Sequence, residues 1–136
     1  MTATSLAAKG RVLRVEGDRI VFQPSNTNYE LHLKVADYTG PVGTSVECII
    51  RVIARKIYSV SSGGNFIQPL FGEPRIIQGQ VRSIEGQQIV VHAGGPIVIS
   101  LPQDENAIDL NTGSITQGSM INVLAFAGAT GEVLAG

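Results

Sequence analysis

Cationic and aromatic side chains in the first half of the chain are the residues whose types suggest a binding chemistry. Proteins that bind single-stranded nucleic acid combine Lys and Arg, which neutralise phosphates, with aromatic rings on which bases stack. Against this partner stand the absence of Trp and the net charge of −1, because such binding depends on local positive charge. Phe22 and Tyr29 are also aromatic, but the strand pattern described below directs both inward. The candidate residues for binding nucleic acid or another ligand are Arg11, Arg14, Arg51, Arg55, Lys56 and Tyr58.

Side chains that serve in catalysis elsewhere are present, but they form no recognisable motif. His32 lies on the expected outward face of its strand, and His92 precedes a pair of glycines. The chain has no Gly-x-Ser-x-Gly sequence, which would mark a nucleophilic serine, and no Cys/His set with zinc-site spacing. Cys48 alternates with Val46 and Ile50, so we expect it to pack in the core as a small apolar side chain. We therefore expect no enzymatic activity, no cofactor and no metal.

The composition excludes several classes of protein. Of the 136 residues, 43% are hydrophobic and 15% are charged, compared with about 25% charged in an average globular protein. A disordered chain would be less hydrophobic and more highly charged. No apolar run approaches the roughly 18 residues of a membrane-spanning helix, so no membrane partner is expected. With one cysteine and no apolar signal segment in the first ten residues, the chain is expected to be cytoplasmic.

The charges are distributed unequally between the two halves of the chain. Residues 1–68 carry a net charge of +3, and residues 69–136 carry a net charge of −4. Such halves can attract each other, attract another copy of the chain, or present a positive face to an anionic partner. The alternative interpretation of the unequal charges is that they lie on ordinary solvated surfaces that have no specific partner.

An internal repeat is the most informative feature of the sequence. Residues 10–22 align with residues 79–91, an offset of about half the chain. Six of the thirteen aligned pairs are identical, namely Gly10/Gly79, Val12/Val81, Glu16/Glu85, Gly17/Gly86, Ile20/Ile89 and Val21/Val90. Each half therefore follows the same order of elements.

Both halves are predicted to consist of strands. Gly17 and Gly86 suit tight hairpin turns, because glycine tolerates a positive φ angle. Residues 29–35 alternate between apolar and polar, which is typical of a strand with one solvated face. This alternation directs Leu31 and Leu33 inward.

Two further segments carry specific expectations. Residues 46–60 are rich in β-branched side chains, and their alternation breaks near Ala54, which predicts a β-bulge there. Residues 104–110 are the best candidate for a single helical turn, because an acidic side chain there would cap its start.

The join between the halves is a Gly- and Pro-containing stretch that is unusually apolar for a linker. Its large apolar side chains would be costly if they were exposed, so we expect them at an interface between the halves or with another subunit. The alternative is that they extend the core of one half. These predicted interface residues are Phe66, Ile67, Leu70 and Phe71.

Short strands, turns marked by glycine and little helix predict an all-β protein of two tandem OB-like (Greek-key) small barrels related by internal duplication. The expected division is a first barrel at 1–62, a junction at 63–74 and a second barrel at 75–136. Each barrel of about 60 residues would be marginally stable alone, which favours packing of the two halves or oligomerisation. The sequence leaves open whether the barrels share one sheet.

The order Gly-x-Val, Glu-Gly and Ile-Val, followed by an alternating strand and by Val42-Gly-Thr-Ser-Val46, resembles the OB-fold superfamily. The tandem layout is similar to the paired repeats of small bacterial molybdate-binding proteins of the Mop or TOBE type. That resemblance implies symmetric oligomers that hold oxyanions between subunits. Where the family has Ser-Ala-Arg-Asn, this chain has residues 5–9, Ser-Leu-Ala-Ala-Lys, so no binding residue is carried over.

Taken together, these features predict a non-catalytic structural or assembly module, or a small-ligand-binding β-barrel module, that self-associates into a homo-oligomer. Binding of single-stranded nucleic acid is the first alternative. Binding of a small, molybdate-like anion at barrel interfaces is the second.

Overall fold

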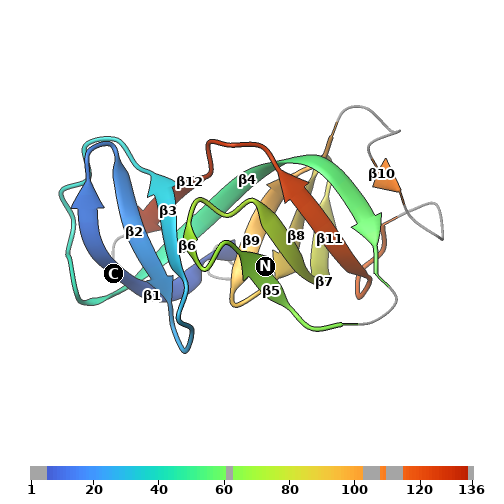
Figure 1. Ribbon diagram of the computed structural model, residues 1–136, viewed down its shortest axis with the longest axis horizontal. Coiled ribbons are helices and arrows are strands. Elements are labelled where there is room, and N and C mark those ends of the chain that lie inside the picture. The colour runs from blue at the N-terminus through green and yellow to red at the C-terminus, as the bar shows by residue number, and fades with distance from the viewer. Residues whose placement is uncertain (1–5, 61–62, 103–107, 110–114, 135–136) are drawn as a thin grey trace.

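The computed structural model describes residues 6–60, 63–102, 108–109 and 115–134. Of these residues, 62% lie in strands and none lies in an α-helix, which confirms the expected all-β class. All of the strands join one mixed sheet (Figure 1). In chain order they are β1 (Ala8–Glu16), β2 (Arg19–Pro24), β3 (Glu30–Lys34), β4 (Ser45–Ser59), β5 (Phe66–Gln68), β6 (Phe71–Gly72), β7 (Ile76–Glu85), β8 (Gln88–His92), β9 (Pro96–Ser100), β10 (Ile108–Asp109), β11 (Met120–Ala125) and β12 (Thr130–Leu134).

The strand pairings on the left of Figure 1 return to their starting strand. Strands β1, β2 and β3 form an antiparallel meander. Strand β3 pairs in parallel with β12, β12 pairs antiparallel with β4, and β4 pairs antiparallel with β1. We call this set of pairings the first circuit.

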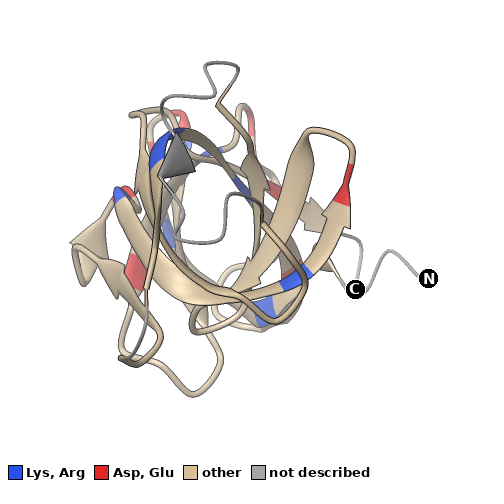
Figure 2. Ribbon diagram, turned by 90° about the vertical axis from the view of Figure 1, so that its right-hand side faces the viewer, with Lys and Arg blue, Asp and Glu red and all other residues tan. Residues whose placement is uncertain are grey.

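The strands on the right form a second circuit with the same order. Strands β7, β8 and β9 form an antiparallel meander, β9 lies parallel to β4, and β11 lies antiparallel to both β4 and β7. Seen from this end, the strands curve around a common centre (Figure 2). Each circuit takes one strand from the other half of the sequence: β12 completes the first circuit, and the C-terminal part of β4 completes the second.

These pairings cross the predicted domain division. Strand β12 lies within the predicted second barrel at 75–136, yet it pairs with β3 and β4. Likewise, β4 lies within 1–62 but pairs with β9 and β11. Neither predicted segment therefore contains all the strands of one circuit, and the sheet is continuous between them.

The aligned segments of the two halves have the same local geometry. Gly17 and Gly86 both have a positive φ, of 64° and 61°, at the turns that follow β1 and β7. The strand register shifts after Val12 in β1 and after Val81 in β7. These positions are matched in the sequence alignment. The aligned residues of the two halves therefore share a positive φ at the turn and a register shift in the preceding strand.

The glycines at the start of the alignment are explained by a close approach between neighbouring strands. A Cβ atom on Gly10 would collide with the backbone carbonyl of Gln23 and lie 2.6 Å from the ring of Phe22. A Cβ atom on Gly79 would collide with the carbonyl of His92, which is the aligned counterpart of Gln23. Any larger residue at either position would have to push two paired strands apart.

A short segment at residues 66–72, which we call the strap, links the two circuits. Its first strand, β5, pairs antiparallel with β7 of the second circuit. Its second strand, β6, pairs in parallel with β3 of the first circuit. The strap therefore lies across the join between the two circuits (Figure 1).

One apolar core runs through both circuits. Phe22, Leu31, Leu33 and Cys48 are fully buried in it, as their alternation in the sequence predicts. Tyr29 packs against this core and is partly buried, so its predicted inward placement is confirmed in part.

The predicted β-bulge and the predicted helical turn have different outcomes. The bulge is confirmed: Ala54 pairs with Ala125 and Lys56 pairs with Leu124, which leaves Arg55 without a partner in the register. The helical turn predicted at 104–110 lies largely outside the described residues. Its described part, Ile108–Asp109, is a strand paired in parallel with β4, so the prediction is wrong there because pairing with β4 prevails over local capping.

We predict that Gly10→Ala and Gly79→Ala each lower the free energy of unfolding by at least about 1–3 kcal/mol, since an added methyl group overpacks a tight site. Urea denaturation of each variant measures this change. Gly64→Ala is the control, because nothing lies within 4 Å of the position its Cβ would occupy. Equal denaturation midpoints for the Gly10→Ala and Gly64→Ala variants would contradict the close approach.

Candidate functional site

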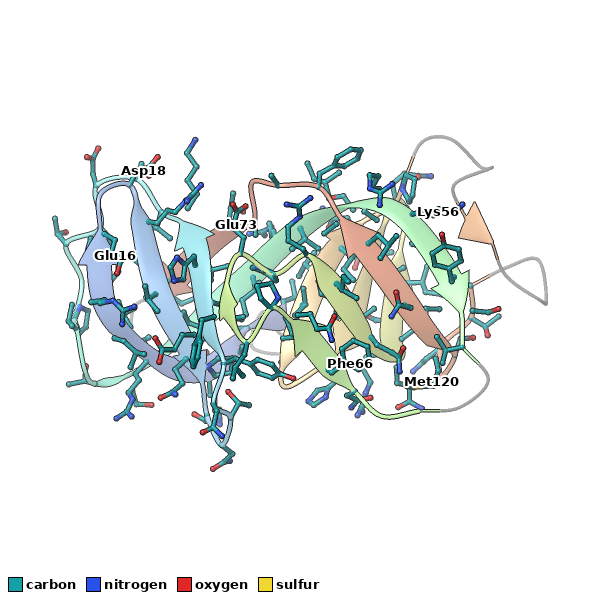
Figure 3. All side chains as sticks on the ribbon, in the orientation of Figure 1. Glu16, Asp18, Lys56, Phe66, Glu73 and Met120 are labelled. Atoms are coloured by element: carbon teal, nitrogen blue, oxygen red, sulfur yellow. The ribbon has the colours of Figure 1, made fainter. Side chains whose placement is uncertain are left out.

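The predicted cationic residues do not converge on one site. Arg11 and Arg14 lie on β1 of the first circuit, whereas Arg55 and Lys56 lie on the C-terminal part of β4. Figure 3 places Glu16, the partner of Arg14, and Lys56 at opposite ends of the molecule.

Two of the predicted cations are neutralised by carboxylates. Arg14 donates from Nε to Glu16 over 2.6 Å and lies 3.4 Å from Glu30. The hydrogen bond from Arg14 lowers the pKa of Glu16. Arg51 donates to Glu132 of β12 over 2.9 Å. These exposed pairs contribute little to stability, but they reduce the positive charge available to a polyanion.

The end of β4 keeps a more open cationic group. The Lys56 ammonium lies 5.1 Å from the centre of the Tyr58 ring, within the range of a cation–π contact. Arg55 occupies the bulge and is exposed. These three residues are the part of the predicted site that the structure brings together.

Arg11 borders a small polar pocket of about 330 Å³. Its guanidinium donates to the side-chain carbonyl of Gln23 over 3.2 Å. Ser25 and Ser45 add hydroxyl groups to the lining, and no acidic residue contributes to it. Such donors suit a small anion.

The predicted interface residues of the strap divide between core and surface. Ile67 is 3% exposed, and its backbone N–H donates to the hydroxyl of Tyr29 over 3.0 Å. Its burial agrees with the alternative prediction, that these side chains extend the core of one half. Phe66 is half-buried. Leu70 and Phe71, by contrast, are 46% and 59% exposed.

The strap borders a second, larger groove of about 610 Å³. Arg75 lines this groove and donates from Nε to the carbonyl of Ala125 over 3.1 Å. Arg75 is not among the site residues predicted from the sequence, although it is one of only two Lys or Arg residues in the second half and directly follows the junction. The other lining residues are Tyr29, Phe66, Ile67, Gln68, Pro69, Leu70 and Ile76.

Glu73 fastens the end of the strap to the loop between β11 and β12. Its carboxylate accepts hydrogen bonds from the backbone N–H groups of Gly128 and Ala129 and lies 3.5 Å from Arg19. The hydrogen bond from Gly128, then that from Ala129 and the charges of Arg19 and Arg75, lower the pKa of Glu73. Figure 3 labels Glu73 near the middle of the molecule, between the circuits.

Cys48 and His92 are two further described side chains of types that can take part in catalysis or metal binding. Burial raises the pKa of the Cys48 thiol to about 12, which leaves it protonated and unreactive at neutral pH. His92 has a buried Nδ1 with no hydrogen-bond partner. Within the described ranges, no three His, Cys, Asp or Glu side chains are grouped so that they could hold a metal ion.

Comparisons with known proteins assign no family: no family model matches the chain, and no curated protein matches it. Among the residues that the structure describes, no helix has the length and apolar character needed to span a bilayer.

We predict that Glu73→Gln destabilises the protein at pH 7 by about 1–3 kcal/mol, because it replaces charge-assisted hydrogen bonds by weaker ones. A carboxylate whose pKa is lowered by folding stabilises the folded state above its unfolded pKa of about 4.3. This contribution disappears as the pH falls through the lowered folded pKa.

The difference between wild type and Glu73→Gln in urea denaturation should therefore shrink from pH 7 towards pH 3. Glu85→Gln, at the exposed β7–β8 turn, serves as the control. A difference that stays constant across this range would contradict the role of the ionised carboxylate.

Proposed function

We propose that the protein is a non-catalytic assembly module that self-associates through the strap. The observation that carries this proposal is the exposure of Leu70 and Phe71, two adjacent large apolar side chains, at 46% and 59%. Adjacent exposed apolar groups of this size are typical of protein interaction sites.

We further infer that each circuit is a five-stranded barrel of the OB type and that the two halves arose by duplication. The common order of pairings supports this, with the third strand parallel to the last in each circuit. The registers agree as well, since Gly10 lies opposite Val46 and Gly79 lies opposite Ile121. The exchange of the last strand would make the two barrels interdependent.

The position of the strap suits an interface between two copies. It lies across both circuits, so a partner seated there would contact both halves of the molecule. The described strand β6 has only two residues and pairs with β3, which makes it too short for extended strand addition. Side-chain packing of Phe71 and Leu70 against the same patch of a second copy, in a two-fold arrangement, is therefore the expected contact.

We predict that the wild-type protein sediments as a reversible dimer or larger oligomer whose mass rises with protein concentration. Phe71→Ser with Leu70→Ser should shift it to a monomer, because the apolar area that drives association is removed. Analytical ultracentrifugation measures both. Val42→Ser is the matched control, since Val42 is also exposed, at 51%, but lies in the loop before β4.

A wild-type protein that remains monomeric at every concentration would refute self-association. An oligomer that persists equally in the double variant would place the interface elsewhere.

Binding of single-stranded nucleic acid is the second candidate, and the grouping of Arg55, Lys56 and Tyr58 on β4 favours it. The ring and two cations are the elements of a stacking and phosphate-binding surface. Two observations count against nucleic-acid binding. Arg51 is paired with Glu132, and the ring of Phe22 is buried.

This second candidate predicts that a fluorescein-labelled oligo-dT of about 15 nucleotides binds the protein, with an affinity that falls steeply between about 50 and 200 mM salt. Arg55→Ala with Lys56→Ala should abolish the change in fluorescence anisotropy, whereas Arg82→Ala should leave it intact. Absence of any salt-sensitive anisotropy change in the wild type would remove this candidate.

A further inference from the structure

The groove beside the strap has the size and walls of a site for a small organic molecule. Its volume of about 610 Å³ lies within the range of about 300–1,000 Å³ that such sites occupy. Most of its wall is apolar, formed by the strap on one side and by Ile76 at the start of β7 on another. An apolar body of a ligand would therefore be removed from water there.

Two polar side chains at this groove, Arg75 and Tyr29, can donate hydrogen bonds to a ligand. Arg75 is held by its Nε bond to Ala125, and its terminal nitrogens form no hydrogen bond or ion pair with the residues that the structure describes. The hydroxyl of Tyr29 accepts from the N–H of Ile67, which leaves its own proton to donate. Among the residues that the structure describes, no acidic residue lines this groove.

The nearest acid in the sequence, Glu73, interacts with Arg75 only through space: the charge of Arg75 contributes to the lowered pKa of Glu73, but the ion pair of the Glu73 carboxylate is with Arg19. Its carboxylate is occupied by the backbone of Gly128 and Ala129 and by Arg19. A planar guanidinium with free terminal N–H groups matches a carboxylate in bidentate geometry. The groove thus joins an apolar wall to one cation whose terminal N–H groups form no hydrogen bond with the described residues.

We propose that this groove binds an amphipathic carboxylate, a small molecule with an aromatic or branched aliphatic body and one carboxylate group. Arg75 binds the carboxylate, the hydroxyl of Tyr29 donates a further hydrogen bond, and Pro69, Leu70 and Ile76 contact the apolar body. The site shares Leu70 with the proposed self-association surface, but Phe71 does not line it, so Phe71 distinguishes the two proposals.

The test titrates 4-phenylbutyrate into uniformly ¹⁵N-labelled protein and follows the amide resonances by NMR. We expect saturable shifts at Ile67, Gln68 and Ile76. The uncharged analogue 4-phenyl-1-butanol and inorganic phosphate, which lacks an apolar body, should each bind at least about tenfold more weakly.

Three variants of the protein make the assignment specific. Arg75→Gln should weaken binding of 4-phenylbutyrate by about tenfold or more, whereas Arg82→Gln, at an arginine within β7 that is not among the lining residues, should leave it unchanged. If Arg75→Gln does not fold, Gln68→Glu places a negative charge at the exposed rim and should weaken binding similarly. Equal binding of the acid and the alcohol, or no loss in the variant tested, would overturn the proposal.

Phe71→Ser separates this proposal from self-association. This variant should keep full affinity for 4-phenylbutyrate whatever its oligomeric state. Loss of binding in Phe71→Ser would place the ligand at an interface between copies and overturn the site as described.

Discussion

Strand β4 is the element on which the rest of the structure depends. Its backbone pairs with β1 and β12 on its N-terminal part and with β9 and β11 further along. A strand must satisfy its N–H and C=O groups wherever water is excluded, and β4 does so with partners from both circuits. Neither circuit can therefore open without exposing backbone that belongs to the other, which couples their stabilities.

The position of the strap also depends on both circuits. Residues 66–72 enter beside β7 and leave beside β3, so their position is defined only when both circuits are formed. Glu73 then ties the end of the strap to the loop before β12. The groove and the exposed pair Leu70 and Phe71 thus lie on a segment that is paired with both circuits, and not on a free linker.

Sequence reasoning succeeded where the signal is local. Alternation placed Leu31 and Leu33 in the core, and a break in alternation located the bulge near Ala54, because side chains of a strand alternate between two faces. The same reasoning could not identify partners. Strand β12 has only five residues, and nothing in its pattern distinguishes pairing with β4 from pairing within its own half.

The predicted binding residues failed to converge for a related reason. The carboxylate that neutralises Arg51 is Glu132, 81 residues away, and no local pattern reveals such a pair. Arg75 went unnoticed because a single cation next to a proline carries no motif, and only the folded strap shows that it borders an apolar groove.

The unequal charges of the two halves acquire a physical meaning in the folded chain. Two ion pairs, Arg51–Glu132 and Arg19–Glu73, each join a cation of the first half to an acid of the second. Both lie where the halves meet, one along the exchanged strand β12 and one at the end of the strap. Opposite charge is thus paired within one molecule, and because exposed pairs contribute little to stability, these two pairs add little to the free energy that holds the halves together. An association between two copies would consequently depend on apolar contacts, which the strap supplies, rather than on attraction between the positive and negative halves.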